Sequence, residues 1–591
     1  MGCHVLYFPQ LAGVLYHDSA SDANEGYRRD RSQGCGPRQI RVECRWCWWS
    51  TYLSEGRLNE IYRTPFKPRQ PEVDVAQAAG VIALGNVASR VLGLVREVVK
   101  AGLFGATGSV GALEVAIRVP TLLYDFLVGG IISSALVPVL SDYTRPERRD
   151  ELWHLVSTLL TLAVVVLAVC VVVGELLAPQ IVWLMAGGYD ADLQAETVQL
   201  LRIMLPAVLF LNLAGIVSGV LYALKRFAFP AFTAAAYNAA IVVLALLLGR
   251  RWGVRSMAWG LLLGAALQVA LQWPGLRDGR LRWVFDLRHV ALRRIGQLYV
   301  PIALGLIVDT LGVILSYNLA SRTGPRSIPW MQYSATLIQF PLGLVSLAIS
   351  IAILPTLSRQ ATDGQSGPFR ATLAQGLRLV LTLTVPAAVG LWVLANPIVG
   401  LVFEHGDFTF IDTLGTVEAL RCHLIGLIFA AVDQPLIFAF YARKDTWTPA
   451  LVGAVTVSLY GNLALIPTLF APLTLNGLIL ANSLKLAAHA LIMLVLLQRR
   501  AGGLGGHGVW RLVFKTACAS IVMGGAVHLL MRGVTPVLPD GFWGELLLVA
   551  GGGLIGTAIY GVLAVLLQIE EIHLLGQALR SGMERLTGVT R

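Results

Sequence analysis

Residues 80–141 read GVIALGNVASRVLGLVREVVKAGLFGATGSVGALEVAIRVPTLLYDFLVGGIISSALVPVLS and decide the fold. Two apolar segments, each long enough to cross a bilayer as a helix, are joined by a short glycine-rich turn. A charge at the bilayer centre costs ~2.5 kcal/mol or more, so it usually faces a bundle interior or a water-filled cavity. The stretch therefore predicts two helices that line a polar cavity of a transporter, and a cavity that receives an anion. The charged residues within it are Arg90, Arg96, Glu97, Lys100, Glu114, Arg118 and Asp125.

The composition places the whole chain in a membrane. Of its 591 residues, 56% are hydrophobic and 14% charged, whereas soluble proteins carry roughly 25% charged residues. The mean hydropathy is +0.68, and apolar runs of membrane length recur along the chain. Backbone groups in hydrocarbon must pair within their own segment, and these runs are too long for barrel strands. We therefore expect an all-α polytopic membrane protein.

Hydropathy and length predict about fourteen membrane-spanning helices. Most of the loop arginines and lysines follow the even-numbered spans, for example those between residues 277 and 294. Basic loops stay in the cytoplasm, so both termini are expected there, in a bacterial cytoplasmic membrane protein with many passes. The net charge of +11 then reflects topology, and we expect no nucleic-acid partner. The expected spans are 76–103, 112–140, 153–176, 196–223, 229–249, 256–273, 296–320, 332–357, 375–396, 414–441, 448–468, 474–497, 511–531 and 544–568.

An internal repeat organises these spans. LYALKRFAFPAF (221–232) aligns with FYARKDTWTPAL (440–451), and SALVPVLS (134–141) aligns with IAILPTLS (351–358), at nearly the same offset. Both matches fall on the same side of the membrane, which predicts two parallel six-helix lobes around a central cleft, followed by two extra helices. The predicted divisions are a polar, disordered N-terminal extension (1–72), an N-lobe (73–275), a C-lobe (276–500), and helices thirteen and fourteen with a cytoplasmic tail (501–591).

The charged residues of the first two spans are the candidates for substrate binding. Arginine offers five donors in a planar fork and is suited to bidentate binding of phosphate. Several of these charges are spaced four or seven residues apart and share helix faces. The alternative is that the charges neutralise one another as structural pairs, or reach toward the membrane interface. The candidate substrate-binding residues are Arg90, Arg96, Glu97, Glu114 and Arg118.

Ionisable residues are sparser in the later spans. Asp309 is a candidate for binding a coupling cation, sodium or a proton, with Asn318 or Asn462 as a polar helper, although it could serve packing alone. The membrane potential is the other possible drive. Asp433, Arg421 and Lys485 also lie in apolar spans. The isolated His423, His489 and His528 are expected to be hydrogen-bonded core histidines.

No pattern indicates catalysis. The chain has no nucleotide-binding GxxxxGK[ST] loop and no HExxH motif, so we expect a transporter without a cofactor rather than an enzyme. Cys44 and Cys47 form a lone CxxC without a second pair at zinc spacing, and we expect no metal site.

Several motifs resemble the MurJ/MviN lipid II flippases, part of a wider exporter superfamily for drugs, oligosaccharidyl lipids and polysaccharides. They are SRVLGLVRE (89–97), LFGATG (103–108), VPTLLYDFLVGGIISSALVPVLSDY (119–143), YSATLIQFPLGLVSLAISIAILPTLSR (333–359) and FYARKDTWTP (440–449). The resemblance covers about residues 75–570. It implies a flippase that moves undecaprenyl-diphosphate-linked peptidoglycan precursor to the outer leaflet by alternating access, and so a role in cell-wall biogenesis and cell shape.

The resemblance also implies site residues and partners. Arg90 and Arg96 match arginines thought to meet the diphosphate, and the last two helices would form a groove for the lipid tail. The partners would be lipid II or a related polyprenyl-diphosphate lipid, and the cell-wall synthesis machinery. This chain departs from the family at four positions: Gly111 replaces an Asp, Tyr124 and Asp125 replace a basic pair, and Thr336 replaces an Arg. The alternatives are a diverged paralogue that exports another lipid-linked glycan or a small molecule, and a membrane scaffold that transports nothing.

Overall fold

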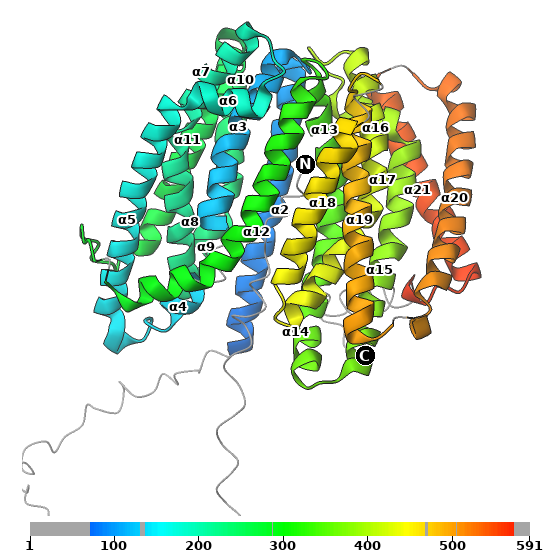
Figure 1. Cartoon of the computed structure of the whole chain (residues 1–591). Coiled ribbons are helices and arrows are strands. Elements are labelled where there is room, and N and C mark those ends of the chain that lie inside the picture. Colours follow the sequence, from blue (N-terminus) through cyan, green and yellow to red (C-terminus); the bar gives the residue numbers. More distant parts are fainter. Residues whose placement is uncertain are drawn as a thin grey trace, which may run out of the picture.

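The computed structural model describes residues 71–129, 136–286, 288–466, 471–503, 505–539 and 541–572, and these form helices without strands. The helices stand side by side in an elongated bundle (Figure 1). Nearly all of the predicted N-terminal extension, the lone CxxC and the end of the C-terminal tail lie outside the described residues. The all-α membrane fold predicted from composition is confirmed.

The first half of the bundle comprises the helices from α2 to α11. Its longest members correspond to the apolar runs of the sequence, and each begins or ends within a few residues of the expected limits. The bounds are α2 (Pro71–Phe104), α3 (Gly108–Tyr124), the π-helix η1 (Asp125–Gly129), α4 (Val137–Ser141), η3 (Pro146–Arg148), α5 (Arg149–Leu176), α6 (Ala178–Ala186), α7 (Ala191–Met204), α8 (Ala207–Ala223), α9 (Ala228–Ala231), α10 (Thr233–Trp252), α11 (Arg255–Gln272) and η4 (Trp273–Leu276).

The second half follows the same order, and two further helices, α20 and α21, pack against its α15 and α16. The bounds are α12 (Val290–Ser321), α13 (Ser327–Pro341), the π-helix η5 (Leu342–Leu347), α14 (Ala348–Thr362), α15 (Ser366–Val393), α16 (Ala395–Phe403), α17 (Phe410–Ala442), α18 (Trp447–Leu465), α19 (Leu475–Ala501), η7 (Gly505–His507), α20 (Val509–Val534), η8 (Thr535–Val537) and α21 (Phe542–Leu566).

Ten helices of the described residues are long and apolar enough to cross a membrane, and α7 with α8, bent by 41°, would make an eleventh. The other three expected spans are helical too. They are α2, α3 with η1, and α12, whose apolar part, Gly305–Ser321, is shorter. The count of fourteen spans and the four predicted divisions of the chain stay predictions.

The internal repeat is visible in the backbone. Lys225 and Lys444, paired in the sequence alignment, adopt the same left-handed conformation, with φ of 59° and 60°. The π-helices η1 and η5 occupy matching places in the two halves, and so do the short helices α6 and α16. Non-glycine residues seldom adopt positive φ, and π-helices are rare. Each of these features therefore occurs twice, at nearly the same spacing along the chain, and the copies identify two lobes with the same architecture.

The turn before α18 shows how one copy is held. Asp445 follows Lys444, and its carboxylate accepts hydrogen bonds from the backbone N–H of Thr448 at 3.0 Å and from the Thr448 hydroxyl at 2.6 Å. Arg500, at the end of α19, forms an ion pair with the same carboxylate. The side chain therefore caps the first turn of α18 and ties it to α19.

The apolar core differs between the two ends of the bundle. We call the end with loops 142–145, 224–227 and 443–446 the basic end; it is lowermost in Figure 1. Toward the opposite end, one core includes buried residues of both lobes, such as Leu113, Met204, Tyr333 and Leu420. At the basic end there are two separate cores. One lies around α5 and α8 and also includes Ala291 and Ile295 at the start of α12, and the other lies around α15 and α17. The lobes therefore share a core toward the opposite end, whereas at the basic end only the start of α12 packs into the core of the first lobe.

Reciprocal contacts seal the joined end. The short helix α6 of the first lobe packs on α12 of the second, and α16 of the second lobe packs on α2 of the first. Beside them, the backbone N–H of Gly188 donates to the Ser321 hydroxyl at 3.0 Å, and the N–H of Asp407 donates to the Gly102 carbonyl at 3.0 Å.

Candidate functional site

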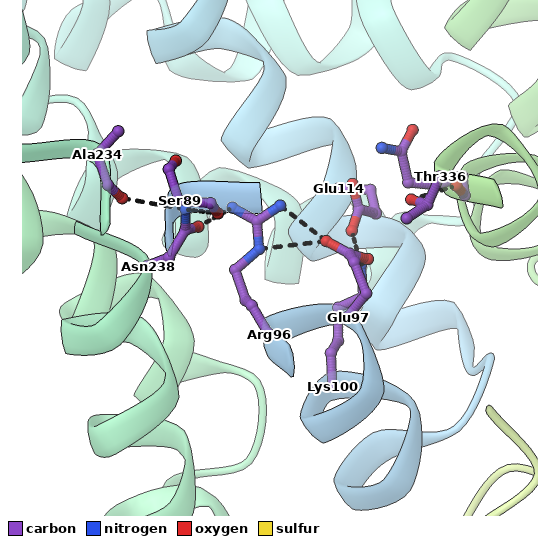
Figure 2. A network of polar contacts seen from close by, with 9 residues as sticks. Ser89, Arg96, Glu97, Lys100, Glu114, Ala234, Asn238 and Thr336 are labelled. Carbon is purple, nitrogen blue, oxygen red and sulfur yellow. Dashed lines mark hydrogen bonds and ion pairs between the residues drawn. The ribbon is translucent and has the colours of Figure 1, made fainter. Parts of the chain in front are cut away.

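The ammonium of Lys100 is the centre of a buried ionic cluster between α2 and α3. It forms ion pairs with Glu97, one turn earlier on α2, and with Glu114 on α3. The three side chains are only 2%, 4% and 7% exposed. Figure 2 shows the two carboxylates converging from neighbouring helices. Burying these charges is tolerable because each has an opposite charge within hydrogen-bond reach.

Arg96 extends the cluster toward α10. Its Nε and Nη2 donate to one oxygen of Glu97 at 3.2 and 2.8 Å, and its Nη1 donates to the side-chain oxygen of Asn238 at 3.1 Å. The Asn238 amide donates in turn to the Ala234 carbonyl at 3.1 Å (Figure 2). Arg96 remains 26% exposed, so part of its guanidinium can still meet a ligand.

Tyr333 connects this cluster to the second lobe. Its ring, on α13, lies 4.8 Å from the Lys100 ammonium, a cation–π contact. Its hydroxyl donates to the carbonyl of Gly105 at 2.9 Å, in the turn between α2 and α3. The ionic cluster therefore lies directly beneath the contacts that join the lobes.

The structure accounts for one departure from the family pattern. A Cβ atom at Gly111 would collide with the hydroxyl of Tyr189 and come within 3.2 Å of the Pro325 carbonyl. An aspartate would therefore fit at this position only if the Tyr189 hydroxyl moved aside. Glu114, one turn further along α3, supplies a carboxylate, which pairs with Lys100. At a second departure, the Thr336 hydroxyl donates to the Gln332 carbonyl of its own helix at 3.0 Å.

Arg90 lies apart from the cluster and reaches the other lobe. It is exposed on α2, yet its guanidinium occupies the space beside Gly343, in η5 of the second lobe. A Cβ atom at residue 343 would lie 2.7 Å from Nη1 and 2.9 Å from Nη2 of Arg90. Only glycine leaves room for this contact. Arg90 therefore faces the second lobe.

Arg118 is half-buried on α3, and its Nε has no hydrogen-bond partner among the described residues. Its positive charge acts on Asp125, two turns further on, and on Tyr317 of α12. Tyr317 also lies within electrostatic range of Glu114. Arg118 is thus close to both the ionic cluster and the second lobe.

The five candidate residues fall into two groups. Arg96, Glu97 and Glu114 are brought together, whereas Arg90 and Arg118 lie outside their hydrogen-bond network. With Lys100, the cluster holds two positive and two negative charges and is neutral. Its carboxylates hold cations in place, so an incoming anion would be attracted chiefly by the two other arginines. Sequence reasoning did not find Asn238 or Gly343, because a lone amide and a residue without a side chain give no signal.

The residues expected to bind a coupling ion are not joined by a hydrogen bond in the described structure. Asp309 is exposed on α12 and lies within electrostatic range of Lys485 and His489. Asn462 is exposed on α18, and its amide donates to the Ser458 carbonyl of its own helix at 2.8 Å. No cluster of three or more metal-ligating side chains occurs among the described residues.

Comparisons with known structures find the same arrangement of helices. The chain is similar to a structure titled "Lipid II flippase MurJ, inward closed conformation", with a TM-score of 0.70 and 24% identity over 83% of this chain and 99% of that one. An inward-facing multidrug-resistance transporter of the MATE family and MOP superfamily gives a TM-score of 0.59 at 13% identity, over 71% of this chain and 96% of that one. At these identities the two likenesses show the fold alone.

Sequence comparisons identify the family. The family model described as "Lipid II flippase MurJ" matches residues 100–542. The lipid II flippase MurJ of Burkholderia cenocepacia is 31% identical over 452 residues, which are 74% of this chain and 87% of the relative. The probable lipid II flippase MurJ of Haemophilus influenzae is 30% identical over 520 residues, 82% of this chain and 99% of the relative. The chain therefore belongs to the MurJ family of lipid II flippases.

Proposed function

We propose that the protein carries lipid II, the undecaprenyl-diphosphate-linked peptidoglycan precursor, from the inner to the outer leaflet of the bacterial cytoplasmic membrane. Membership of the family supports this substrate, and the fold supports the movement. The lobes share one core at one end and have separate cores at the basic end, where only the start of α12 packs with the first lobe. If basic loops lie in the cytoplasm, the lobes part on the side where the precursor is made. Both chain termini then lie in the cytoplasm.

The observation that carries the proposal is the position of Arg90. It lies below the seal, on the first lobe, with its guanidinium against the second lobe at Gly343. An arginine placed there can bind a diphosphate at a position that lies against both lobes. We assign Arg90 and Arg118 to direct attraction of the diphosphate, with Arg96 as a further donor. Glu97 and Glu114 are positioning residues that hold Lys100 and Arg96.

The direction of movement follows from alternating access. Diphosphate bound between the lobes would replace the contact of Arg90 with the second lobe and favour closure at the basic end. The reciprocal contacts of α6 with α12 and of α16 with α2 would then separate. A coupling cation or the membrane potential, worth ~2.3 kcal/mol per charge per 100 mV, would drive the return. The cell-wall synthesis machinery is the partner we expect on the outer side.

The test is complementation in a bacterium whose own lipid II flippases can be depleted. The wild-type chain should restore exposure of lipid II on the outer leaflet, measured by an externally added enzyme that acts only on exposed lipid II. Arg90→Ala should lower this exposure at least ~10-fold, since a charge-assisted bond contributes roughly 1.5–3 kcal/mol.

The matched control is Arg148→Ala. Arg148 is an arginine at the basic end whose guanidinium pairs with exposed Glu151 and lies 4.3 Å from the centre of the Tyr143 ring, and its loss removes the same charge. It should leave exposure of lipid II unchanged. If the wild-type chain is present in the membrane and lipid II stays inside, the proposed function is wrong. If Arg90→Ala works as well as wild type, the assignment of the diphosphate site is wrong.

A further inference from the structure

His489 occupies an unusual setting inside the second lobe. Its Nδ1 lies 2.9 and 2.8 Å from the two carboxylate oxygens of Asp433 on α17. The backbone of Pro449, at the start of α18, also lies within electrostatic range of the imidazole. The side chains of His489 and Asp433 are only 12% and 10% exposed. The histidine is hydrogen-bonded inside the lobe, as the sequence predicted, and its partner is a buried carboxylate on a neighbouring helix.

Other ionisable groups surround this pair. Lys485 lies one turn before His489 on α19, and Asp309 on α12 is within electrostatic range of both. The Lys485 ammonium lies 5.9 Å from the centre of the Tyr460 ring on α18, whose hydroxyl donates to Ser316 of α12 at 3.1 Å. Among the described residues, the charged and titratable groups that these contacts place around His489 are therefore Asp433, Asp309 and Lys485, with Tyr460 beside Lys485.

Charge balance in this group depends on one proton. Asp433 forms no other ion pair in the described part of the chain, so its buried carboxylate has no opposite charge at hydrogen-bond distance when the imidazole of His489 is neutral. Protonation of the imidazole supplies that opposite charge, and an unpaired charge is costly at membrane depth. The hydrogen bond fixes where the proton goes. An ionised Asp433 only accepts, so Nδ1 of His489 carries an N–H, and a second proton at Nε2 makes the imidazolium.

We propose that His489 is a proton-binding site of the transporter, with Asp433 as its counter-ion, and that it takes up and releases one proton per transport cycle. This inference rests on the proposed function, because the proton would drive the same movement of the lobes. Only one helix separates His489 on α19 from the first lobe. Helix α19 packs on α12, and α12 packs on α6, η1 and α4 of the first lobe. A change of charge between α17 and α19 therefore acts beside the helix that joins the lobes.

The first experiment follows protonation directly and needs no substrate. The protein, labelled with ¹⁵N-histidine and placed in lipid nanodiscs, is titrated by NMR. The signal that His489→Gln removes should change from imidazolium to neutral imidazole within about pH 5–8, the range in which histidines titrate. Asp433→Asn, which removes the counter-ion, should move this midpoint to lower pH. A His489 signal that stays in one protonation state from about pH 5 to 9 would overturn the proposal.

The second experiment tests coupling. Proteoliposomes with fluorescent lipid II are given a pH gradient of one unit while the membrane potential is held at zero. If one proton is coupled to each cycle, the ratio of probe in the two leaflets should change by up to about tenfold. His489→Gln should still equilibrate the probe but show no shift. His423→Gln is the matched control, because His423 faces the Ser334 hydroxyl at 3.1 Å rather than a carboxylate, and it should retain the shift.

The outcomes separate the two proposals. A shift that survives in His489→Gln, or a wild-type protein that flips lipid II without any shift, contradicts the coupling role of His489. A wild-type protein that does not move lipid II at all contradicts the proposed function instead. In that case the NMR titration decides by itself whether His489 binds and releases a proton.

Discussion

Replacement of Lys100 by methionine probes the buried ionic cluster. The ammonium is the ion-pair partner of both Glu97 and Glu114, and all three side chains are almost fully buried. After the substitution, Glu97 still has Arg96 beside it at 2.8 Å. Glu114 forms no other ion pair in the described part of the chain, so it would keep a buried charge without compensation.

The expected loss follows from this geometry. Removing one partner of a buried ion pair costs about 3–5 kcal/mol. Unfolding entropy is about 2.1 cal/mol/K per residue, or roughly 1 kcal/mol/K for about 500 residues, so the apparent Tm should fall by about 3–5 °C. The double variant Lys100→Met/Glu114→Gln removes the uncompensated charge, and most of the loss should be recovered.

The assay is thermal unfolding of the purified protein in detergent, followed by tryptophan fluorescence. Lys515→Met is the matched control, because Lys515 is half-exposed and the one hydrogen bond of its ammonium within the described residues is to the Gln568 carbonyl, at 3.4 Å. It should leave the Tm within about 1 °C, since exposed substitutions change stability by about 0.5 kcal/mol or less. The reasoning is refuted if Lys100→Met melts like the wild type, or if the double variant melts as low as the single one.

Three further predictions concern positions at which the structure leaves little freedom. Gly111→Asp, which restores the family's residue, should destabilise the protein by about 1–3 kcal/mol through overpacking, and Tyr189→Phe in the same chain should recover part of this in a melting assay. Gly343→Ala should slow lipid II flipping by displacing the guanidinium docked there, whereas Gly390→Ala, in a helix with open space around its Cβ position, should not. Desolvation raises the pKa of Asp445, but hydrogen bonds from a threonine and an arginine outweigh it and hold the pKa below its usual value. Its contribution to stability is therefore present above about pH 4 and lost as the pH falls further, so the melting temperatures of wild type and Asp445→Asn should converge in acid.

The fold was largely predictable because its signals are local. Long apolar runs set the limits of the helices, and the expected spans agree with the observed helices within a few residues at most ends. The internal repeat predicted two similar lobes. The short helices α6 and α16 were missed, because nine apolar residues are too few to cross a membrane and resemble a loop between spans.

The site was predictable in its charges but not in its contacts. The sequence singled out the ionisable residues of α2 and α3, since charge in an apolar run is conspicuous. It could not show that Lys100 joins Glu97 to Glu114, because that pairing depends on how two helices pack. Nor could it show that His489 meets Asp433, which lies on a different helix. Residues that meet only through the packing of different helices have no characteristic spacing in the sequence.

The reciprocal packing of α6 on α12 and of α16 on α2 bears on how such a protein could arise. Two identical six-helix subunits, related by a twofold axis, would make this contact twice, because the short helix of each would pack against its neighbour. An ancestral homodimer could thus have closed itself before gene fusion linked the copies. Fusion then freed each copy to diverge, which is why one now carries the arginines and the other the histidine–aspartate pair.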